Sequence, residues 1–373
     1  MAIEKIKVKR KRTPSKEEIA FKKRFYELMF ELDLFNKFKK TFLLDIKSET
    51  NYGYYAHLYL PVGLSYKKLQ DKKDDLEDNL NCMWIMNVEP FRNYAEVRVV
   101  LRPVDESVDF VNPKIKPHEL YLGLSFSNHV QKNNNNDNCM FLLSGSTGSG
   151  KTRFMYQILL SWIMGCSPNE VDIYLSDIAK NEYIQFQDVR HVKYYASELE
   201  ELYNMTTNID KELKKRKDTI TQYRKKGLAT NIKEYNKLSK NKLSYCYIVI
   251  DEFSVLIEDK TDTKSEKEQK EYILAVLKRL SKIGRSLGIF TFLATQKTTR
   301  DEMPSILKNM SAVRISFSAN DSISSEVIMG SNIAMGLPPR VAVFSQNGGH
   351  TVNYLYSPSL ITEDGKLQEL LRP

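Results

Sequence analysis

Residues 139–152 read Cys-Met-Phe-Leu-Leu-Ser-Gly-Ser-Thr-Gly-Ser-Gly-Lys-Thr, and they are the most informative part of the chain for its fold class. The largely apolar residues 139–144 predict a buried strand. Residues 145–152 match the pattern GxxxxGK[ST] in full, and residues 153–162 continue as a helix. A strand, a glycine-rich loop and a helix in this order form a phosphate-binding P-loop, because backbone N–H groups and the helix N-terminus converge on the anion.

The side chains of this loop have separate expected roles. Lys151 would neutralise phosphate oxygens, and the Thr152 hydroxyl would be a ligand of Mg²⁺. The candidate nucleotide-binding residues are Gly145, Ser146, Thr147, Gly148, Ser149, Gly150, Lys151, Thr152 and Arg153.

A second candidate site follows the apolar run at residues 245–250, which is typical of a buried central strand. Asp251 and Glu252 come directly after it, and two carboxylates in such a place are costly unless they have a role. We expect Asp251 to hold Mg²⁺ through water and Glu252 to orient and deprotonate the attacking water. A third strand, residues 288–293, leads to Gln296, which could sense the γ-phosphate. This pattern favours hydrolysis over simple nucleotide binding.

The order of elements around these motifs predicts two domains. From Cys139 onward strands alternate with helices, which predicts an α/β fold with a mostly parallel sheet, a RecA-like P-loop motor domain over residues 113–373. Residues 15–112 read as a helix, two strands, a helix and two strands, which predicts a small α+β domain. Residues 1–14 are a basic tail. The polar stretch 131–138 is expected to be a surface loop.

Composition limits the function classes. The 373 residues carry a net charge of +9, which favours a polyanionic partner such as nucleic acid. An AT-rich genome, which encodes many lysines, would give the same excess of positive charge. The four cysteines form no CxxC pair, so we expect reduced thiols without a metal site or disulfide framework. No apolar run approaches the roughly 20 residues of a membrane helix, and no signal peptide is recognisable. We therefore expect a cytoplasmic protein that partners could recruit to the inner face of the membrane.

The motifs together resemble the FtsK/SpoIIIE-type DNA translocases, including the coupling ATPases of conjugative plasmids and integrative elements. The matching stretches are GSTGSGKT (145–152), YIVIDEF (247–253), GRSLGIFTFLATQ (284–296) and VRISFS (313–318), with weaker similarity in KGLATNIKEYN (226–236) and GLSYKKLQDKKDDLEDNL (63–80). The resemblance implies a ring, usually a homo-hexamer, that threads double-stranded DNA and binds ATP with Mg²⁺ between subunits. It also implies that Arg285 is an arginine finger reaching the neighbour's nucleotide and that Gln296 is the sensor.

The sequence departs from the family pattern at several places. The family often has Asp-Pro-Lys where residues 176–180 read Ser-Asp-Ile-Ala-Lys, and Arg-Pro where this chain has Lys297-Thr298. This sequence shows neither the winged-helix domain nor the membrane helices of chromosomal members. These differences favour a mobile-element protein over one that segregates chromosomes.

The expected function is an ATP-dependent double-stranded DNA translocase, the coupling ATPase of a conjugative element that works with a relaxase and a membrane secretion channel. A phage-type genome-packaging or replication motor is one alternative, and a nucleotide-switched DNA-binding adaptor without translocation is another. A small GTPase is disfavoured, because Asn-Lys at 236–237 and 241–242 is not followed by Asp. The basic run 211–242 is either a solvated helical face or, in part, a surface that contacts phosphates without reading sequence.

Overall fold

The computed structural model describes residues 13–50, 52–88, 91–102, 109–125, 130–135, 138–178, 181–296, 308, 311–346, 351–360 and 371. The chain divides into two compact units, Met1–Val104 and Asp105–Pro373. Most of the expected basic tail, Ala179, Lys180 and the pair Lys297-Thr298 lie outside the described residues.

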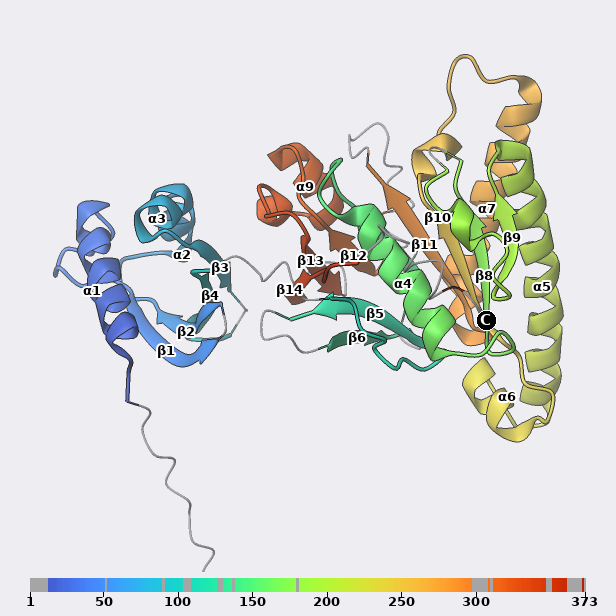
Figure 1. Cartoon of the computed structure of the whole chain (residues 1–373), viewed down its shortest axis with the longest axis horizontal. Helices are drawn as coiled ribbons and strands as arrows, with labels where there is room; N and C mark the ends of the chain where they lie inside the picture. Colours follow the sequence, from blue (N-terminus) through green and yellow to red (C-terminus); the bar gives the residue numbers. More distant parts are fainter. Residues whose placement is uncertain are drawn as a thin grey trace, which may run out of the picture. The chain divides into compact units, whose positions relative to one another are not determined.

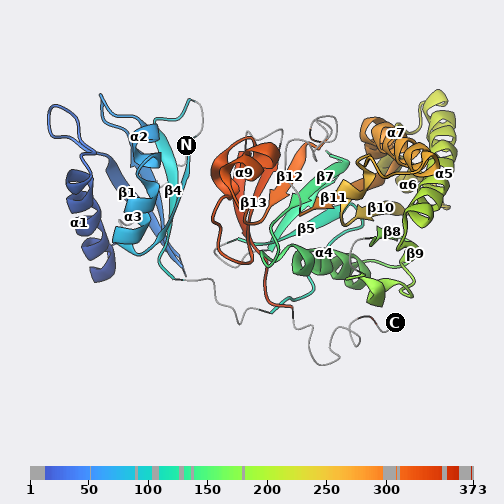
Figure 2. The ribbon, with the colours of Figure 1, turned by 90° about the horizontal axis from the view of Figure 1, so that it is seen from above.

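The first unit is a four-stranded antiparallel sheet, in the order β1-β2-β4-β3, with helices packed on one face (Figure 2). Its elements are α1 (Lys16–Glu31), β1 (Leu43–Thr50), β2 (Gly53–Tyr59), α2 (Tyr66–Gln70), α3 (Lys73–Leu80), β3 (Met83–Asn87) and β4 (Tyr94–Val100). Phe25 of α1 stacks on Trp84 of β3 with ring centroids 5.5 Å apart, and both side chains are buried. The predicted small α+β domain is confirmed, with its second helix divided into α2 and α3.

The second unit is built on one large sheet, shown in Figure 1. Within the described residues the strand order is β6-β5-β14-β13-β12-β7-β11-β10-β8-β9, and the run from β12 to β9 is parallel. Its strands are β5 (Glu119–Leu124), β6 (Val130–Asn134), β7 (Met140–Ser144), β8 (Val171–Ser176), β9 (Val192–Ala196), β10 (Tyr245–Ile250), β11 (Ile289–Thr295), β12 (Val313–Ser316), β13 (Val341–Gln346) and β14 (Thr351–Tyr356). Its helices include α4 (Lys151–Gly165), α5 (Leu199–Lys225), α6 (Ile232–Leu238), α7 (Lys264–Leu287) and α9 (Ser322–Met329).

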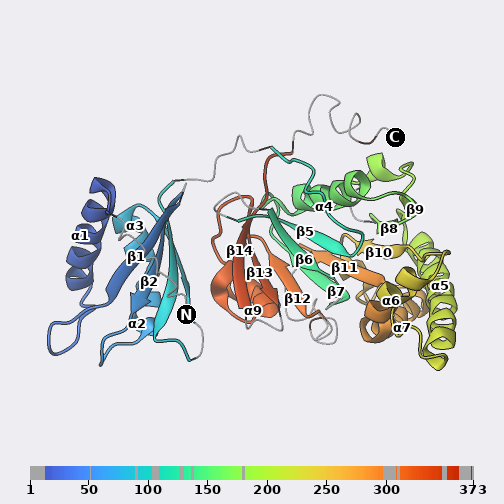
Figure 3. The ribbon, with the colours of Figure 1, turned by 90° about the horizontal axis from the view of Figure 1, so that it is seen from below.

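Helices cover both faces of the parallel strands, as expected for an α/β domain. Figures 2 and 3 show α4 on one side of the sheet and α5 with α7 on the other. Aromatic rings fill the interior: Trp162 of α4 stacks on Tyr247 at 3.8 Å, and Phe141 stacks on Phe292 at 4.4 Å between ring centroids. The predicted RecA-like P-loop fold is confirmed. None of the helices in the described parts of the chain has the length and apolarity to cross a membrane.

The expectation of a surface loop at residues 131–138 is wrong for residues 131–134, and residues 136–137 lie outside the described part of the chain. The first part of this stretch is strand β6, and Asn133 and Asn135 are buried. The Asn133 amide donates to the Asn135 side-chain oxygen at 3.1 Å, and the Asn135 amide donates to the Tyr247 hydroxyl at 3.1 Å. Because each of these two amides finds a partner, Asn133 and Asn135 can be buried, while Lys132 and Asn134, beside and between them, are exposed.

One residue of the basic run 211–242, Arg216, is buried and stabilises the fold. Arg216 is only 2% exposed, and its guanidinium donates to the backbone oxygens of Ser244 at 2.6 Å and Leu287 at 3.1 Å. Its Nε also donates to the Glu212 carboxylate at 2.7 Å. Arg216 therefore connects α5 to the segments that precede β10 and β11. It is not available to contact DNA.

Candidate active site

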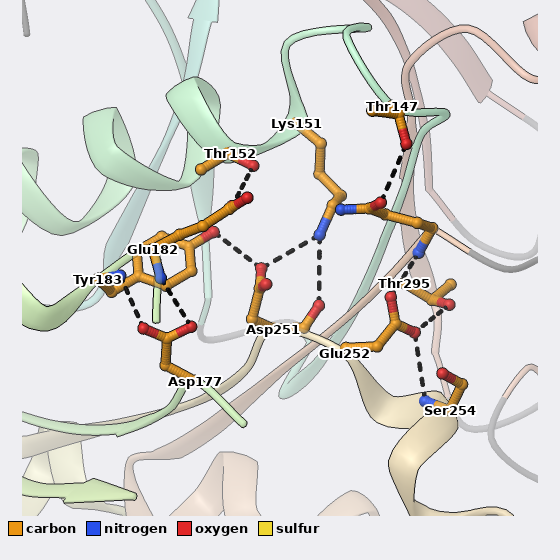
Figure 4. A network of polar contacts seen from close by, with 11 residues as sticks. Thr147, Lys151, Thr152, Asp177, Glu182, Tyr183, Asp251, Glu252, Ser254 and Thr295 are labelled. Atoms are coloured by element: carbon orange, nitrogen blue, oxygen red, sulfur yellow. Dashed lines mark hydrogen bonds and ion pairs between the residues drawn. The ribbon is translucent and has the colours of Figure 1, made fainter. Parts of the chain in front are cut away.

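The candidate site lies where the parallel strands β7, β8, β10 and β11 end. Ile250 pairs with Ser176 on one side, and Thr295 pairs with Ser144, so these strands finish at one edge of the sheet. We call this the carboxyl edge. It brings the P-loop, Asp251 and Gln296 together, as Figure 4 shows for most of these side chains.

The P-loop backbone needs glycine at position 150. Gly150 has φ +107°, a value that side-chain-bearing residues rarely adopt, and an added Cβ would lie 3.3 Å from the Arg340 Cα. The Arg340 N–H donates to the Ser149 oxygen at 2.9 Å, so the strand β13 region packs directly on the loop. This contact fixes the position from which α4 begins.

Lys151 is paired with Asp251. Lys151 Nζ lies 3.1 Å from Asp251 Oδ1 and 3.3 Å from the Asp251 backbone oxygen. The two side chains are 3% and 2% exposed. A bound phosphate therefore has to compete with Asp251 for the ammonium group.

Glu252 is held by three donors beside this pair. Its Oε1 accepts from the Thr295 hydroxyl at 2.7 Å and from the Ser254 N–H at 3.3 Å. Its Oε2 accepts from the Gln296 N–H at 2.9 Å. The Gln296 side-chain oxygen in turn accepts from the Thr147 hydroxyl at 3.2 Å, so the carboxylate, the Gln296 segment and the P-loop form one connected network.

Two residues of this network, Glu182 and Tyr183, were missed in the sequence. The Thr152 hydroxyl donates to Glu182 Oε2 at 2.7 Å, and the Tyr183 hydroxyl donates to Asp251 Oδ1 at 2.8 Å (Figure 4). Burial, and then the charge of Asp251, raises the pKa of Tyr183 well above its usual value, so this hydroxyl stays a neutral donor. No motif marks either residue, because both follow β8 in an irregular loop.

Asp177 organises that loop. Its carboxylate accepts from the Glu182 N–H at 3.1 Å and the Tyr183 N–H at 2.7 Å, and from the Tyr195 hydroxyl at 2.7 Å. Burial raises the pKa of Asp177, and these hydrogen bonds oppose that rise. The place where the family often has Asp-Pro-Lys therefore positions two side chains against Thr152 and Asp251.

A cavity of about 420 Å³ opens over the P-loop. Its lining comprises Ser146, Thr147, Gly148, Gly150, Lys151, Thr152, Arg153, Glu182, Gln296, Pro339 and Arg340. Pro339 and Arg340 were also missed, since they come from the far end of the sequence and only the folded sheet brings them here. The oxygen atoms of Thr152 and Asp251 are ligands that suit Mg²⁺, and Glu182 adds a second carboxylate beside Thr152.

Arg285 lies far from this cavity. It stands in the last turn of α7, just before β11 begins, whereas Gln296 follows the end of β11. Seven strand residues span about 20 Å, so Arg285 is at the opposite edge of the sheet from Lys151. It can contact a nucleotide only if that nucleotide is held by another copy.

The family model described as the FtsK/SpoIIIE family matches residues 115–300. Through this domain, the chain belongs to the FtsK/SpoIIIE family. Among curated relatives, the DNA translocase FtsK of Chlamydia pneumoniae is 24% identical over 291 residues, which cover 72% of this chain and 34% of that protein. The ESX secretion system protein YukB of Bacillus subtilis is 28% identical over 225 residues, which cover 58% of this chain and 14% of that protein. The chain thus spans about a third of the length of such relatives, or less.

Solved structures agree with the FtsK/SpoIIIE fold. The conjugation coupling protein TcpA of pCW3, in a monomer form with ATPγS, superposes with a TM-score of 0.64 and 18% identity. The match covers 94% of this chain and 99% of that one. ATPases 2 and 3 of EssC from Geobacillus thermodenitrificans give a TM-score of 0.58, with 20% identity over 73% of this chain and 50% of that one. At these identities the likeness shows the fold alone.

Proposed function

We propose that this chain hydrolyses ATP and uses the energy to move double-stranded DNA. The observation that carries the proposal is the placement of Glu252 beside the P-loop. Its carboxylate is held by Thr295, Ser254 and Gln296 rather than by a cation within the described contacts. A carboxylate fixed in this way is suited to accept a proton from water at the γ-phosphate.

The proposed chemistry assigns one role to each residue of the network. Lys151 leaves Asp251 and neutralises the phosphate oxygens, and Glu252 takes a proton from the water that attacks the γ-phosphorus. The bond from that phosphorus to the β–γ bridging oxygen breaks, giving ADP and phosphate. Mg²⁺, when bound with the nucleotide, would neutralise phosphate charge, and Thr152 and Asp251 are the residues that would hold it. Gln296 is joined to both Glu252 and Thr147, so it would respond when the γ-phosphate leaves.

The DNA substrate and the ring are further parts of the proposal. The net charge of +9 suits a polyanion, and several curated relatives carry the name DNA translocase. A homo-hexamer would give Arg285 a nucleotide to contact, since its own P-loop lies at the other edge of the sheet. The fold match to a conjugation coupling protein over nearly the whole chain favours a conjugative role, with a relaxase and a membrane secretion channel as partners and the inner face of the membrane as the place of work.

A second candidate function is transport of protein rather than DNA. YukB is named as an ESX secretion system protein, and the cytoplasmic domain of the type VII secretion ATPase EccC from Thermomonospora curvata shares the fold with a TM-score of 0.55. The energy of ATP hydrolysis at the P-loop would then move a polypeptide. The two candidates differ in whether duplex DNA is moved.

Displacement of a triplex-forming oligonucleotide from duplex DNA tests the proposal directly. A motor that tracks along the duplex removes the third strand when ATP is added, whereas a static DNA-binding adaptor leaves it in place. We expect ATP-dependent displacement by the native chain and none by Lys151→Ala. Hydrolysis without displacement, with duplex DNA bound, would reject translocation of DNA and favour the adaptor, whereas hydrolysis without any binding of duplex DNA would favour the protein-transport candidate.

A further inference from the structure

A second cavity of about 420 Å³ lies at the amino-terminal edge of the parallel strands, near α6 in Figure 1. Its walls come from the end of α5, the loop before α6, the start of α6 and the end of α7. The lining residues are Arg224, Thr230, Asn231, Ile232, Lys233, Arg285 and Ser286. We call this cavity the basic pocket, because three of its side chains are cationic and none of the lining residues is acidic.

The wall formed by the loop before α6 is ordered by specific hydrogen bonds. Arg224 Nη2 donates to the Thr230 backbone oxygen at 2.7 Å, which closes the loop onto the end of α5. Glu234 Oε2 accepts from the Thr230 N–H at 2.7 Å and from its hydroxyl at 2.8 Å. The nearest carboxylate in sequence is therefore occupied by Thr230, and it stabilises the wall without lining the pocket.

The floor of the basic pocket ties α6 to the turn between α7 and β11. Ile232 is 1% exposed, and its Cδ1 would lie 2.4 Å from a Cβ placed on Gly288. Gly288 has φ +69° and ends α7 three residues after Arg285. This close approach holds the backbone of Lys233 in a fixed relation to the backbone of Arg285.

Arg224, Lys233 and Arg285 are exposed and line one cavity, so their charges together give it a positive potential that attracts an anion. Guanidinium groups bind phosphate oxygens through paired N–H donors, and an ammonium adds a compact charge. Thr230, Asn231 and Ser286 complete the lining, but their side chains donate within the protein, to Glu234, Thr230 and Ile283 respectively, so the three cations carry the recognition of the anion. The chemistry of the lining therefore matches a phosphate group.

The phosphate cannot come from the nucleotide on the same P-loop. Ser286 and Gly288 precede β11, and the P-loop lies beyond the other end of that strand, about 20 Å away. We propose that the basic pocket, through Arg224 and Lys233 together with Arg285, binds a phosphate group from outside its own P-loop. Its source is the DNA backbone or the nucleotide of a second copy. The choice of these sources rests on the proposed function, whereas the binding of phosphate does not.

The first test measures phosphate binding alone. Tripolyphosphate is titrated calorimetrically into Lys151→Ala protein, so that the P-loop contributes little. This protein is compared with the same background carrying Arg224→Ala and Lys233→Ala. The matched control carries Lys264→Ala and Lys278→Ala, which remove the same charge from exposed positions on α7, outside the basic run 211–242. We expect at least about tenfold weaker binding for the pocket variant than for the control, since the variant loses two charge-assisted contacts to phosphate. Equal affinities would overturn the proposal.

The second test identifies the source in protein with an intact Lys151. If DNA supplies the phosphate, the pocket variant binds a fluorescein-labelled duplex more weakly than the control, measured by fluorescence anisotropy. If a second copy's nucleotide supplies it, the pocket variant loses ATP hydrolysis and regains it when mixed with Lys151→Ala chains, which still carry an intact basic pocket. If neither result separates the two variants, the proposal is overturned. Absence of hydrolysis by the native chain would instead reject the proposed function and leave the tripolyphosphate result valid.

Discussion

Lys151 and Asp251 form a buried ion pair at the carboxyl edge, with 3.1 Å between Nζ and Oδ1. Removing one partner leaves the other charge buried and unpaired, which costs about 3–5 kcal/mol in such pairs. We therefore expect Asp251→Ala to lower the free energy of unfolding of the nucleotide-free P-loop domain by an amount in this range. Urea denaturation can be followed through Trp162 in a Trp84→Phe background, since these two tryptophans lie in different units.

The control for this prediction is a double-mutant cycle with Lys151→Ala. If the pair is coupled, the double variant is destabilised by clearly less than the sum of the two single variants. Additive effects would show that Lys151 and Asp251 do not stabilise each other, and the nucleotide-free pairing would have no energetic importance.

Glu252→Gln separates hydrolysis from binding. Glutamine keeps the size of the side chain and can still accept from Thr295, but it cannot take a proton from water. We expect ATP turnover to fall by about 10²–10⁴-fold, the usual contribution of a general base, with nucleotide affinity nearly unchanged. Steady-state hydrolysis and the binding of a fluorescent ATP analogue measure the two effects. Glu271→Gln, at an exposed position of α7, is the matched control; intact turnover in Glu252→Gln would remove Glu252 from the catalytic role.

Glu182→Gln tests the contact to Thr152. The Glu182 carboxylate lies 2.7 Å from the Thr152 hydroxyl, the group expected to hold Mg²⁺, and its negative charge favours a cation there. We expect the Mg²⁺ concentration for half-maximal hydrolysis to rise by about tenfold, a common effect of altering a group that supports a metal ligand. The measurement is a Mg²⁺ titration at fixed ATP. An unchanged or lower requirement would mean that Glu182 only holds Thr152 while the site is empty.

Arg216→Ala and Lys217→Ala show which of these two residues of the basic run stabilises the fold and which is free of that role. Arg216 satisfies buried backbone oxygens, so we expect Arg216→Ala to destabilise the P-loop domain by about 3 kcal/mol or more. The neighbouring Lys217 is exposed, and its removal should leave stability within about 0.5 kcal/mol. Urea denaturation checks both variants. A stable Arg216→Ala protein with reduced duplex affinity would restore Arg216 to the DNA-facing set.

Local patterns in the sequence predicted the parts of the site that follow strands. The P-loop around Lys151 and the carboxylate pair Asp251-Glu252 each stand at the end of an apolar run, and parallel strands end at one edge. The same reasoning brought Gln296 to this edge, where its N–H meets Glu252. The expected roles of these residues remain predictions.

Local sequence patterns could not predict the contacts between segments that are distant in the sequence. Glu182 and Tyr183 reach the site through a loop that Asp177 shapes, and Arg340 reaches it only because β13 joins the sheet. The burial of Asn135 depends on a hydroxyl of Tyr247, more than a hundred residues away. The polar composition of residues 131–138 predicted a surface loop. Composition does not show that the fold brings the Tyr247 hydroxyl to Asn135.

The most direct measurement is the rate of ATP hydrolysis with no DNA, with single-stranded DNA and with duplex DNA, beside Lys151→Ala. We expect strong stimulation by duplex DNA and no activity in Lys151→Ala under any condition, because phosphate binding needs the ammonium group. Hydrolysis that duplex DNA leaves unchanged would contradict a DNA-driven motor, and hydrolysis that survives in Lys151→Ala would contradict the assignment of the site.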